Sequence, residues 1–152
     1  MEPRLDHWRL VPDAYKATRT LEDYVRKSGL EHSLLELVKI RASQINGCAF
    51  CIHMHTRDAR QAGETEERIY LLDAWRESPL YTPRERAALA WTEAVTLISE
   101  TNAPDDVYQE MRRHFSEEEA VKLTLAIATI NVWNRMGVSF RALHPVGTAA
   151  KG

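Results

Sequence analysis

Apolar residues recur every three to four positions along most of the chain, the spacing that places side chains on one face of an α-helix. In residues 12–29, for example, Ala14, Ala17 and Leu21 follow this spacing, and Gly29 closes the segment. The same spacing predicts six further helices, at residues 33–46, 48–62, 65–75, 82–98, 104–114 and from 116 through 132.

Helix-start signals support this assignment. Thr82 stands before a proline, as an N-cap before the first helical position does, and Ser116 with Glu119 forms a capping box. Period-two alternation between turn residues is missing, and Asn46-Gly47, a dipeptide typical of hairpin turns, lies between two helical patterns. The sequence therefore predicts an all-α fold of about seven helices.

The last predicted helix differs from the others because residues 120–132 are apolar nearly all round. Such a helix is buried on several sides, and in a chain of this size another subunit can cover part of it. Trp8 and Tyr81 are further candidates for exposed aromatic contacts. We therefore expect bundle packing that forms a homo-oligomer.

Length and charge narrow the range of functions. The 152 residues fit one domain over residues 1–152, and 20 Lys and Arg against 22 Asp and Glu give a net charge of −2. No basic cluster of the kind that binds nucleic acid is present. The longest nearly apolar run, residues 123–130, is too short to span a membrane, and residues 1–10 lack the apolar segment of a secretion signal. We expect a cytoplasmic protein that binds neither nucleic acid nor membrane.

The two cysteines of the chain, Cys48 and Cys51, carry the clearest chemical signal. If a helix begins near Cys48, then Cys48, Cys51 and His55 lie on one helical face. Both sulfurs would lie in the first turn, where free backbone N–H groups and a nearby imidazole lower a thiol pKa. The spacing therefore predicts a thiol activated for nucleophilic or redox chemistry.

Other uses of the two cysteines have to be weighed against this one. Buried structural thiols are common. Structural zinc needs four ligands, and His53 and His55 point to different sides of a helix, so the two cysteines and both histidines cannot converge on one ion. Haem attachment requires a histidine where Ile52 stands, and two cysteines are too few for a cluster held by four thiolates.

Glu36 is harder to place from spacing alone. It precedes Cys48 by twelve residues. In a straight helical hairpin it would lie about 16 Å from the turn, opposite residues beyond Cys51. Spacing therefore does not bring Glu36 to the sulfurs, and taken alone it would be a surface charge.

Residues 36–63, ELVKIRASQINGCAFCIHMHTRDARQAG, resemble the core motif of the alkylhydroperoxidase D (AhpD)-like group of the carboxymuconolactone decarboxylase superfamily. That motif is a glutamate, eleven residues and then Cys-x-x-Cys-x-x-x-His, which Glu36, Cys48, Cys51 and His55 match at every position. The chain departs from the founding alkylhydroperoxidase in having Phe50 where that protein has a histidine, and in lacking its second related half. Superfamily members that decarboxylate the muconolactone generally lack the cysteine pair.

The resemblance implies a peroxide-reducing thiol–disulfide oxidoreductase and assigns four catalytic roles. Cys51 would attack a hydroperoxide, Cys48 would close a disulfide with it, His55 would act as base, and Glu36 would orient His55. By contrast, the first cysteine is the nucleophile in thioredoxin-type motifs, which by itself favours Cys48. The resemblance also implies a homo-oligomer, either a hexamer or a trimer.

An external dithiol, carried by a lipoylated or thioredoxin-like protein, would have to reduce the disulfide again. The sequence has no glycine-rich phosphate-binding loop, so we expect no bound flavin or nicotinamide, and neither a resident cofactor nor a metal. Two other functions stay open. One is a non-catalytic helical oligomer that senses oxidation or binds zinc, and the other is a carboxymuconolactone decarboxylase-type lyase that uses Glu36 and His55 for proton transfer.

Overall fold

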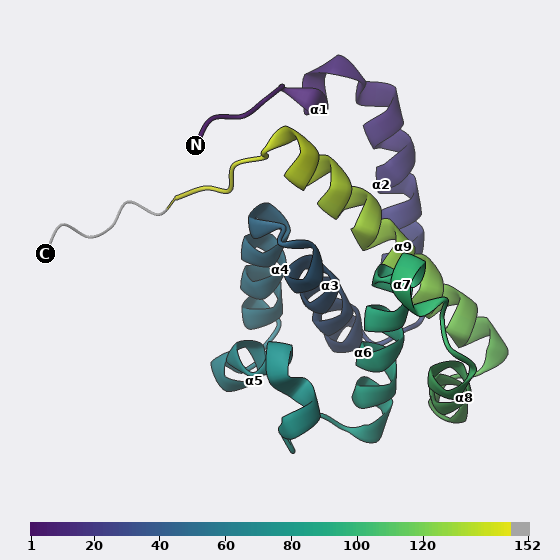
Figure 1. The fold of residues 1–152 in the computed structure, drawn as a ribbon. Coiled ribbons are helices and arrows are strands. Elements are labelled where there is room, and N and C mark those ends of the chain that lie inside the picture. The colour runs from purple at the N-terminus through teal and green to yellow at the C-terminus, as the bar shows by residue number, and fades with distance from the viewer. Residues whose placement is uncertain (147–152) are drawn as a thin grey trace, which may run out of the picture.

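The structure, a computed structural model that describes residues 1–146, is all-α as predicted (Figure 1). In this part of the chain there are nine α-helices and one 3-10 helix: α1 (His7–Leu10), α2 (Pro12–Arg26), α3 (His32–Asn46), α4 (Ala49–Gln61), α5 (Glu66–Tyr70), η1 (Leu72–Glu77), α6 (Pro83–Thr96), α7 (Ile98–Thr101), α8 (Asp105–His114) and α9 (Glu117–Phe140).

The seven predicted helices are all present, and the higher count comes from short elements. α1 and α7 are four residues long, and the helix predicted at residues 65–75 is divided into α5 and η1. The predicted capping box of Ser116 and Glu119 is present at the start of α9, and the predicted N-cap Thr82 forms a second capping box with Glu85 at the start of α6. Gly47 has φ 65°, a left-handed conformation that glycine adopts without strain and that lets the chain leave α3 and enter α4 within two residues.

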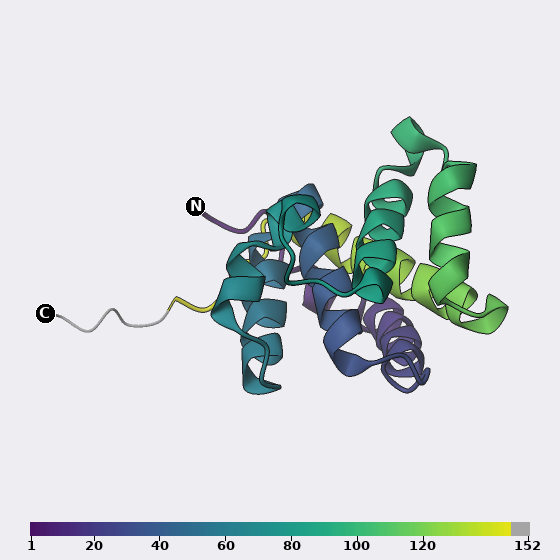
Figure 2. The ribbon, with the colours of Figure 1, turned by 90° about the horizontal axis from the view of Figure 1, so that it is seen from below.

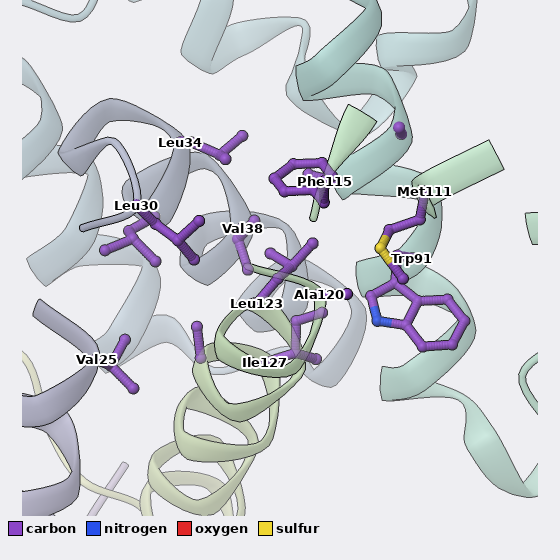
Figure 3. Packing of buried hydrophobic residues seen from close by; sticks show 14 of the residues in the cluster. Val25, Leu30, Leu34, Val38, Trp91, Met111, Phe115, Ala120, Leu123 and Ile127 are labelled. Atoms are coloured by element: carbon purple, nitrogen blue, oxygen red, sulfur yellow. The ribbon is translucent and has the colours of Figure 1, made fainter. Parts of the chain in front are cut away.

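Helix α3 lies in the middle of the molecule and packs against α4, α6 and α9 (Figures 1 and 2). The largest apolar cluster fills the space where α2, α3, α6, α8 and α9 meet (Figure 3). Val38, Trp91, Leu123 and Ile127 are among its buried members. This core fixes α3 and α9 relative to each other, and these two helices form two walls of the site described below.

The expectations about exposed apolar surface are met only in part. Tyr81 is buried and donates a hydrogen bond to the carbonyl oxygen of Arg68, so its prediction as an exposed contact residue was wrong. Trp8 is 36% exposed, and Val121 and Val132 of α9 are 61% and 43% exposed. The homo-oligomer stays a prediction. Within residues 1–146, no helix is both long and apolar enough to cross a membrane.

Candidate active site

The turn between α3 and α4 holds both cysteines. Cys48 is the N-cap of α4, and its sulfur accepts a hydrogen bond from the backbone N–H of Cys51 at 3.4 Å. The backbone N–H of Cys48 donates to the carbonyl oxygen of Ser43 at 2.9 Å, which ties the turn to α3. Both thiols are free, and the two residues are 1% and 2% exposed. The structure therefore places the pair in the first turn of a helix, as its spacing indicates.

Glu36 and His55 form a buried pair between α3 and α4. Nδ1 of His55 lies 2.8 Å from Oε2 of Glu36, and the two residues are 6% and 1% exposed. Burial works to raise the pKa of Glu36, but the hydrogen bond and charge of His55, together with Lys39, outweigh it and hold that pKa below its usual value. Glu36 thus reaches the imidazole one turn beyond Cys51. A second histidine, His32, has its Nε2 3.7 Å from Oε1 of Glu36.

The two thiols differ in their ionisation. The neighbouring Cys51 thiol acts as a hydrogen-bond donor to Cys48 and is the main cause that lowers the pKa of Cys48 to about 7. The same interaction, together with burial and the charge that Cys48 then carries, raises the pKa of Cys51. In the reduced protein the first proton therefore leaves Cys48, and Cys51 needs a base to lose its own.

Helix α9 supplies a wall of the site that the sequence did not point to. Asn134 is fully buried, donates to Ser43 Oγ at 2.9 Å and accepts from Asn46 Nδ2 at 2.9 Å. Its amide also lowers the pKa of both thiols. One turn further along, Gly137 leaves room for Cys48, because a Cβ built on it would lie 3.1 Å from the Cys48 sulfur. Neither residue belongs to the Glu36–His55 motif, and the spacing within that motif does not point to them.

A largely apolar pocket of about 320 Å³ opens beside Cys51 and His55. Its aromatic lining comes from three separate segments: Trp8 from α1, Phe50 from α4 and Trp133 from α9. The ring of Trp8 packs near both of the others, with its centroid 6.3 Å from that of Phe50 and 6.0 Å from that of Trp133. The pocket can hold a small apolar molecule against the Cys51 side of the dithiol.

Charged residues of α2 and α4 line the same pocket. They are Glu22, Arg26 and Asp58. Glu22 pairs with Lys39, a lysine of α3 that is 1% exposed. The buried ammonium therefore pairs with a residue of the pocket wall and also helps to keep the carboxylate of Glu36 charged.

The other histidines lie apart from the cysteine pair. His53 points to another surface, where its ring stacks on His144 with centroids 4.8 Å apart. His7 is 4% exposed and hydrogen-bonds Tyr15, so it is a buried histidine with a partner in the fold. Across residues 1–146, no three His, Cys, Asp or Glu side chains are grouped as metal ligands would be.

Comparison with known proteins gives a consistent result. Residues 12–94 match the sequence profile of the Carboxymuconolactone decarboxylase family. The uncharacterized protein YdfG of Bacillus subtilis is 46% identical over 139 residues, which cover 91% of this chain and 95% of YdfG.

Solved structures extend the similarity to the fold. A protein of unknown function from Agrobacterium tumefaciens, suggested to be the antioxidant defence protein AhpD, is 53% identical with a TM-score of 0.93, and the match covers 95% of this chain and 99% of that one. The debrominase Bmp8 is 21% identical with a TM-score of 0.76 over 89% of this chain and 73% of its own, a similarity of fold alone.

Proposed function

The chain belongs to the AhpD-like group of the carboxymuconolactone decarboxylase family, and from this premise we propose that it reduces hydroperoxides through its Cys48–Cys51 dithiol. One observation carries the proposal: His55, hydrogen-bonded to the buried carboxylate of Glu36, lines the same pocket as Cys51, beside a second thiol. A carboxylate that orients an imidazole next to a thiol is the arrangement that activates a sulfur nucleophile.

Cys51 is the attacking thiol in this proposal, because it lines the apolar pocket with His55 whereas Cys48 does not. Nδ1 of His55 is engaged by Glu36, which leaves Nε2 to take the proton of Cys51. The Cys51 thiolate then attacks the terminal oxygen of the hydroperoxide. An S–O bond forms, the O–O bond breaks, and the sulfur is oxidised to a sulfenic acid. The leaving alkoxide takes the proton from His55 and departs as an alcohol.

Cys48 is the resolving thiol. The Asn134 amide and the backbone N–H groups of Phe50 and Cys51 also lower the pKa of Cys48, and they still favour its thiolate once the Cys51 thiol has been oxidised. That thiolate attacks the sulfenic sulfur of Cys51, an S–S bond forms, and hydroxide leaves to be protonated to water. An external dithiol, supplied by a lipoylated or thioredoxin-like protein, provides the two electrons that restore the reduced pair.

Trapping the intermediate tests this assignment. The Cys48→Ser variant, which cannot close the disulfide, is treated with cumene hydroperoxide and then with dimedone, which labels sulfenic acids. Peptide mass spectrometry should find the label on Cys51. The matched Cys51→Ser variant should carry little label on Cys48. A label found mainly on Cys48 would reverse the two roles, and absence of both label and peroxide consumption would end the proposal.

Two other activities are separated by simple measurements. A zinc-binding oligomer predicts about one zinc per chain in the purified protein, and a zinc-binding or redox-sensing oligomer alike predicts no turnover of peroxide. A lyase that relies on Glu36 and His55 predicts activity that persists when Cys48 and Cys51 are both replaced by alanine. The peroxidase predicts that this double variant is inactive.

A further inference from the structure

The two cysteines open onto different surfaces of the molecule. Cys51 lines the apolar pocket, whereas Cys48 lines a separate groove of about 530 Å³ that does not include Cys51. Phe50 and Gly137 line both hollows and therefore stand between them. A disulfide between the two sulfurs would be approachable from two sides.

The groove beside Cys48 is formed where the N-terminal segment meets the end of α9 (Figure 1). The backbone N–H of Arg4 donates to the carbonyl oxygen of Phe140 at 3.0 Å, and its guanidinium donates to that of Ser139 at 3.0 Å. Arg141 ends α9 in a left-handed conformation with φ 56°. Residues 135 or more positions apart in the sequence are thus held together at this surface.

The charge of the groove distinguishes it from the apolar pocket. Arg4 and Arg141 are both exposed, and neither forms an ion pair within residues 1–146. No aspartate or glutamate lines the groove, whereas Glu22 and Asp58 line the pocket on the Cys51 side. The groove therefore presents positive charge next to a sulfur, in a chain whose net charge is −2.

We propose that this groove, defined by Arg4, Cys48 and Arg141, is where an acidic protein carrying a dithiol docks to reduce the Cys48–Cys51 disulfide. The inference rests on the proposed function, since it concerns the return half of that reaction. Its occupant is argued from charge complementarity, because two unpaired guanidiniums favour a partner with carboxylates around its thiols. Cys48 is 1% exposed, so the partner's dithiol must project from its surface far enough to enter the groove.

The partner's dithiol would reduce the Cys48–Cys51 disulfide in two successive thiol–disulfide exchanges. A partner thiolate attacks the Cys48 sulfur, a mixed disulfide forms, and Cys51 leaves as a thiolate that takes a proton from protonated His55. The partner's second thiolate then attacks the partner sulfur that is bonded to Cys48 in the mixed disulfide. Cys48 leaves as a thiolate, and the partner departs with an internal disulfide. Two electrons pass from partner to protein. Cys48 is the better final leaving group because its thiolate is the more stable of the two.

A first experiment identifies the sulfur under attack. The protein is oxidised with diamide, so no peroxide is involved, and is then exposed briefly to glutathione, an anionic monothiol, before acid quenching and peptide mass spectrometry. Glutathione should be found on Cys48. An adduct on Cys51 would show entry through the apolar pocket and overturn the inference, as would the lack of any adduct, which is expected if a second copy of the chain covers the groove.

A second experiment tests the charge. Diamide-oxidised protein is reduced at low salt with dihydrolipoate or dihydrolipoamide, which share one dithiol and differ by one negative charge. Dihydrolipoate should react about two to five times faster, and this preference should vanish in an Arg4→Gln/Arg141→Gln variant and at high salt. Arg4→Lys should retain the preference, and so should Arg113→Gln, which removes an exposed arginine of α8.

The outcomes of these experiments separate this inference from the proposed function. Equal rates for the two dithiols, or a preference that survives in the Arg4→Gln/Arg141→Gln variant, would overturn the docking site while leaving peroxide reduction untouched. Failure of diamide to join Cys48 and Cys51 would remove the redox cycle itself, and the docking site with it.

Discussion

Gly137 of α9 lies directly against the sulfur of Cys48, so that a Cβ added to the glycine would be 3.1 Å from that sulfur. Gly137→Ala should therefore displace the Cys48 sulfur by a few tenths of an ångström and slow disulfide formation about tenfold. Alanine is favoured over glycine inside a helix by about 1 kcal/mol, and this gain offsets the cost of displacing the sulfur, so the free energy of unfolding should change little. Rapid-quench measurement of disulfide formation after peroxide addition tests this, with the exposed Ser139→Ala as control. An unchanged rate in Gly137→Ala would contradict a close-packed sulfur.

The Glu36–His55 hydrogen bond gives a second prediction. Glu36→Gln keeps the shape of the side chain but removes the charge that stabilises the protonated imidazole, so peroxide turnover should fall about 10- to 100-fold. Because the pKa of Glu36 lies below its usual value, the carboxylate is charged throughout the neutral range, and the loss should be similar from pH 6 to 8. Glu110→Gln is the matched control, since Glu110 bonds His114 on the surface of α8. A variant with full activity would remove Glu36 from the mechanism.

The sequence predicted the parts of the site that depend on local spacing. Cys48, Cys51 and His55 share a face because they lie within two turns of one helix, and the helical period alone places them there. The position of Glu36 depends on how closely α3 and α4 pack, which periodicity does not give, so its role came only from the resemblance.

The remaining parts of the site come from segments that are far apart in the chain. Asn134 and Trp133 meet the cysteine turn from more than 80 residues away, and Trp8 from about 40. Their side chains are brought there by the packing of α1 and α9, which depends on the whole core. The exposure of Tyr81 was predicted wrongly for the same reason. Its burial depends on packing against residues that are distant in the sequence and close in space.

Ionisation of Cys48 supplies a third prediction. With its pKa lowered to about 7, Cys48 should be about half ionised at pH 7, whereas an ordinary thiol would be ionised to about 3%. Thiolate absorbance at 240 nm in the reduced protein should therefore rise with a midpoint near pH 7. Asn134→Ala removes a hydrogen bond that favours the thiolate, so it should move the midpoint upward.

Asn131→Ala is the control for that titration. Asn131 is also buried in α9 and bonds Asn46 and Thr96, but it is not among the groups that shift the pKa of Cys48. Both alanine variants should lose about 1–3 kcal/mol of stability, because each leaves buried polar partners unsatisfied. Equal thiolate midpoints in the two variants would show that Asn134 acts on the fold and not on the sulfur.

The aromatic lining of the apolar pocket predicts a preference among substrates. Phe50→Ala removes one ring from the pocket, and aromatic contacts of this kind contribute about 0.5–1.5 kcal/mol. KM for cumene hydroperoxide should therefore rise about two- to tenfold, while kcat/KM for hydrogen peroxide, which has no apolar group, should stay the same. Tyr108→Ala, which removes an aromatic side chain of α8 on another surface, should change neither. A parallel loss with both peroxides would indicate damage to the thiols instead.

The ion pair of Lys39 and Glu22 joins the pocket wall to α3, and we expect it to contribute to the stability of the fold. Lys39 is 1% exposed, so Lys39→Met removes a buried positive charge and leaves Glu22, itself only 17% exposed, without its partner. The loss of stability should be about 2–4 kcal/mol, measured by urea unfolding. Lys122→Met should cost much less than Lys39→Met, because its partner Glu118 is exposed to solvent.

The double variant Lys39→Met/Glu22→Gln decides what the pair contributes. If the cost of Lys39→Met comes from an uncompensated carboxylate, removing the charge of Glu22 as well should restore more than half of the lost stability. Lys39 also helps to keep the pKa of Glu36 low, and the double variant does not replace that effect. We therefore expect its stability to recover while its peroxide turnover stays below that of the wild type, most clearly at acidic pH, where Glu36 begins to take up a proton. Recovery of both together would show that Lys39 serves the fold and has no part in charging the Glu36–His55 pair.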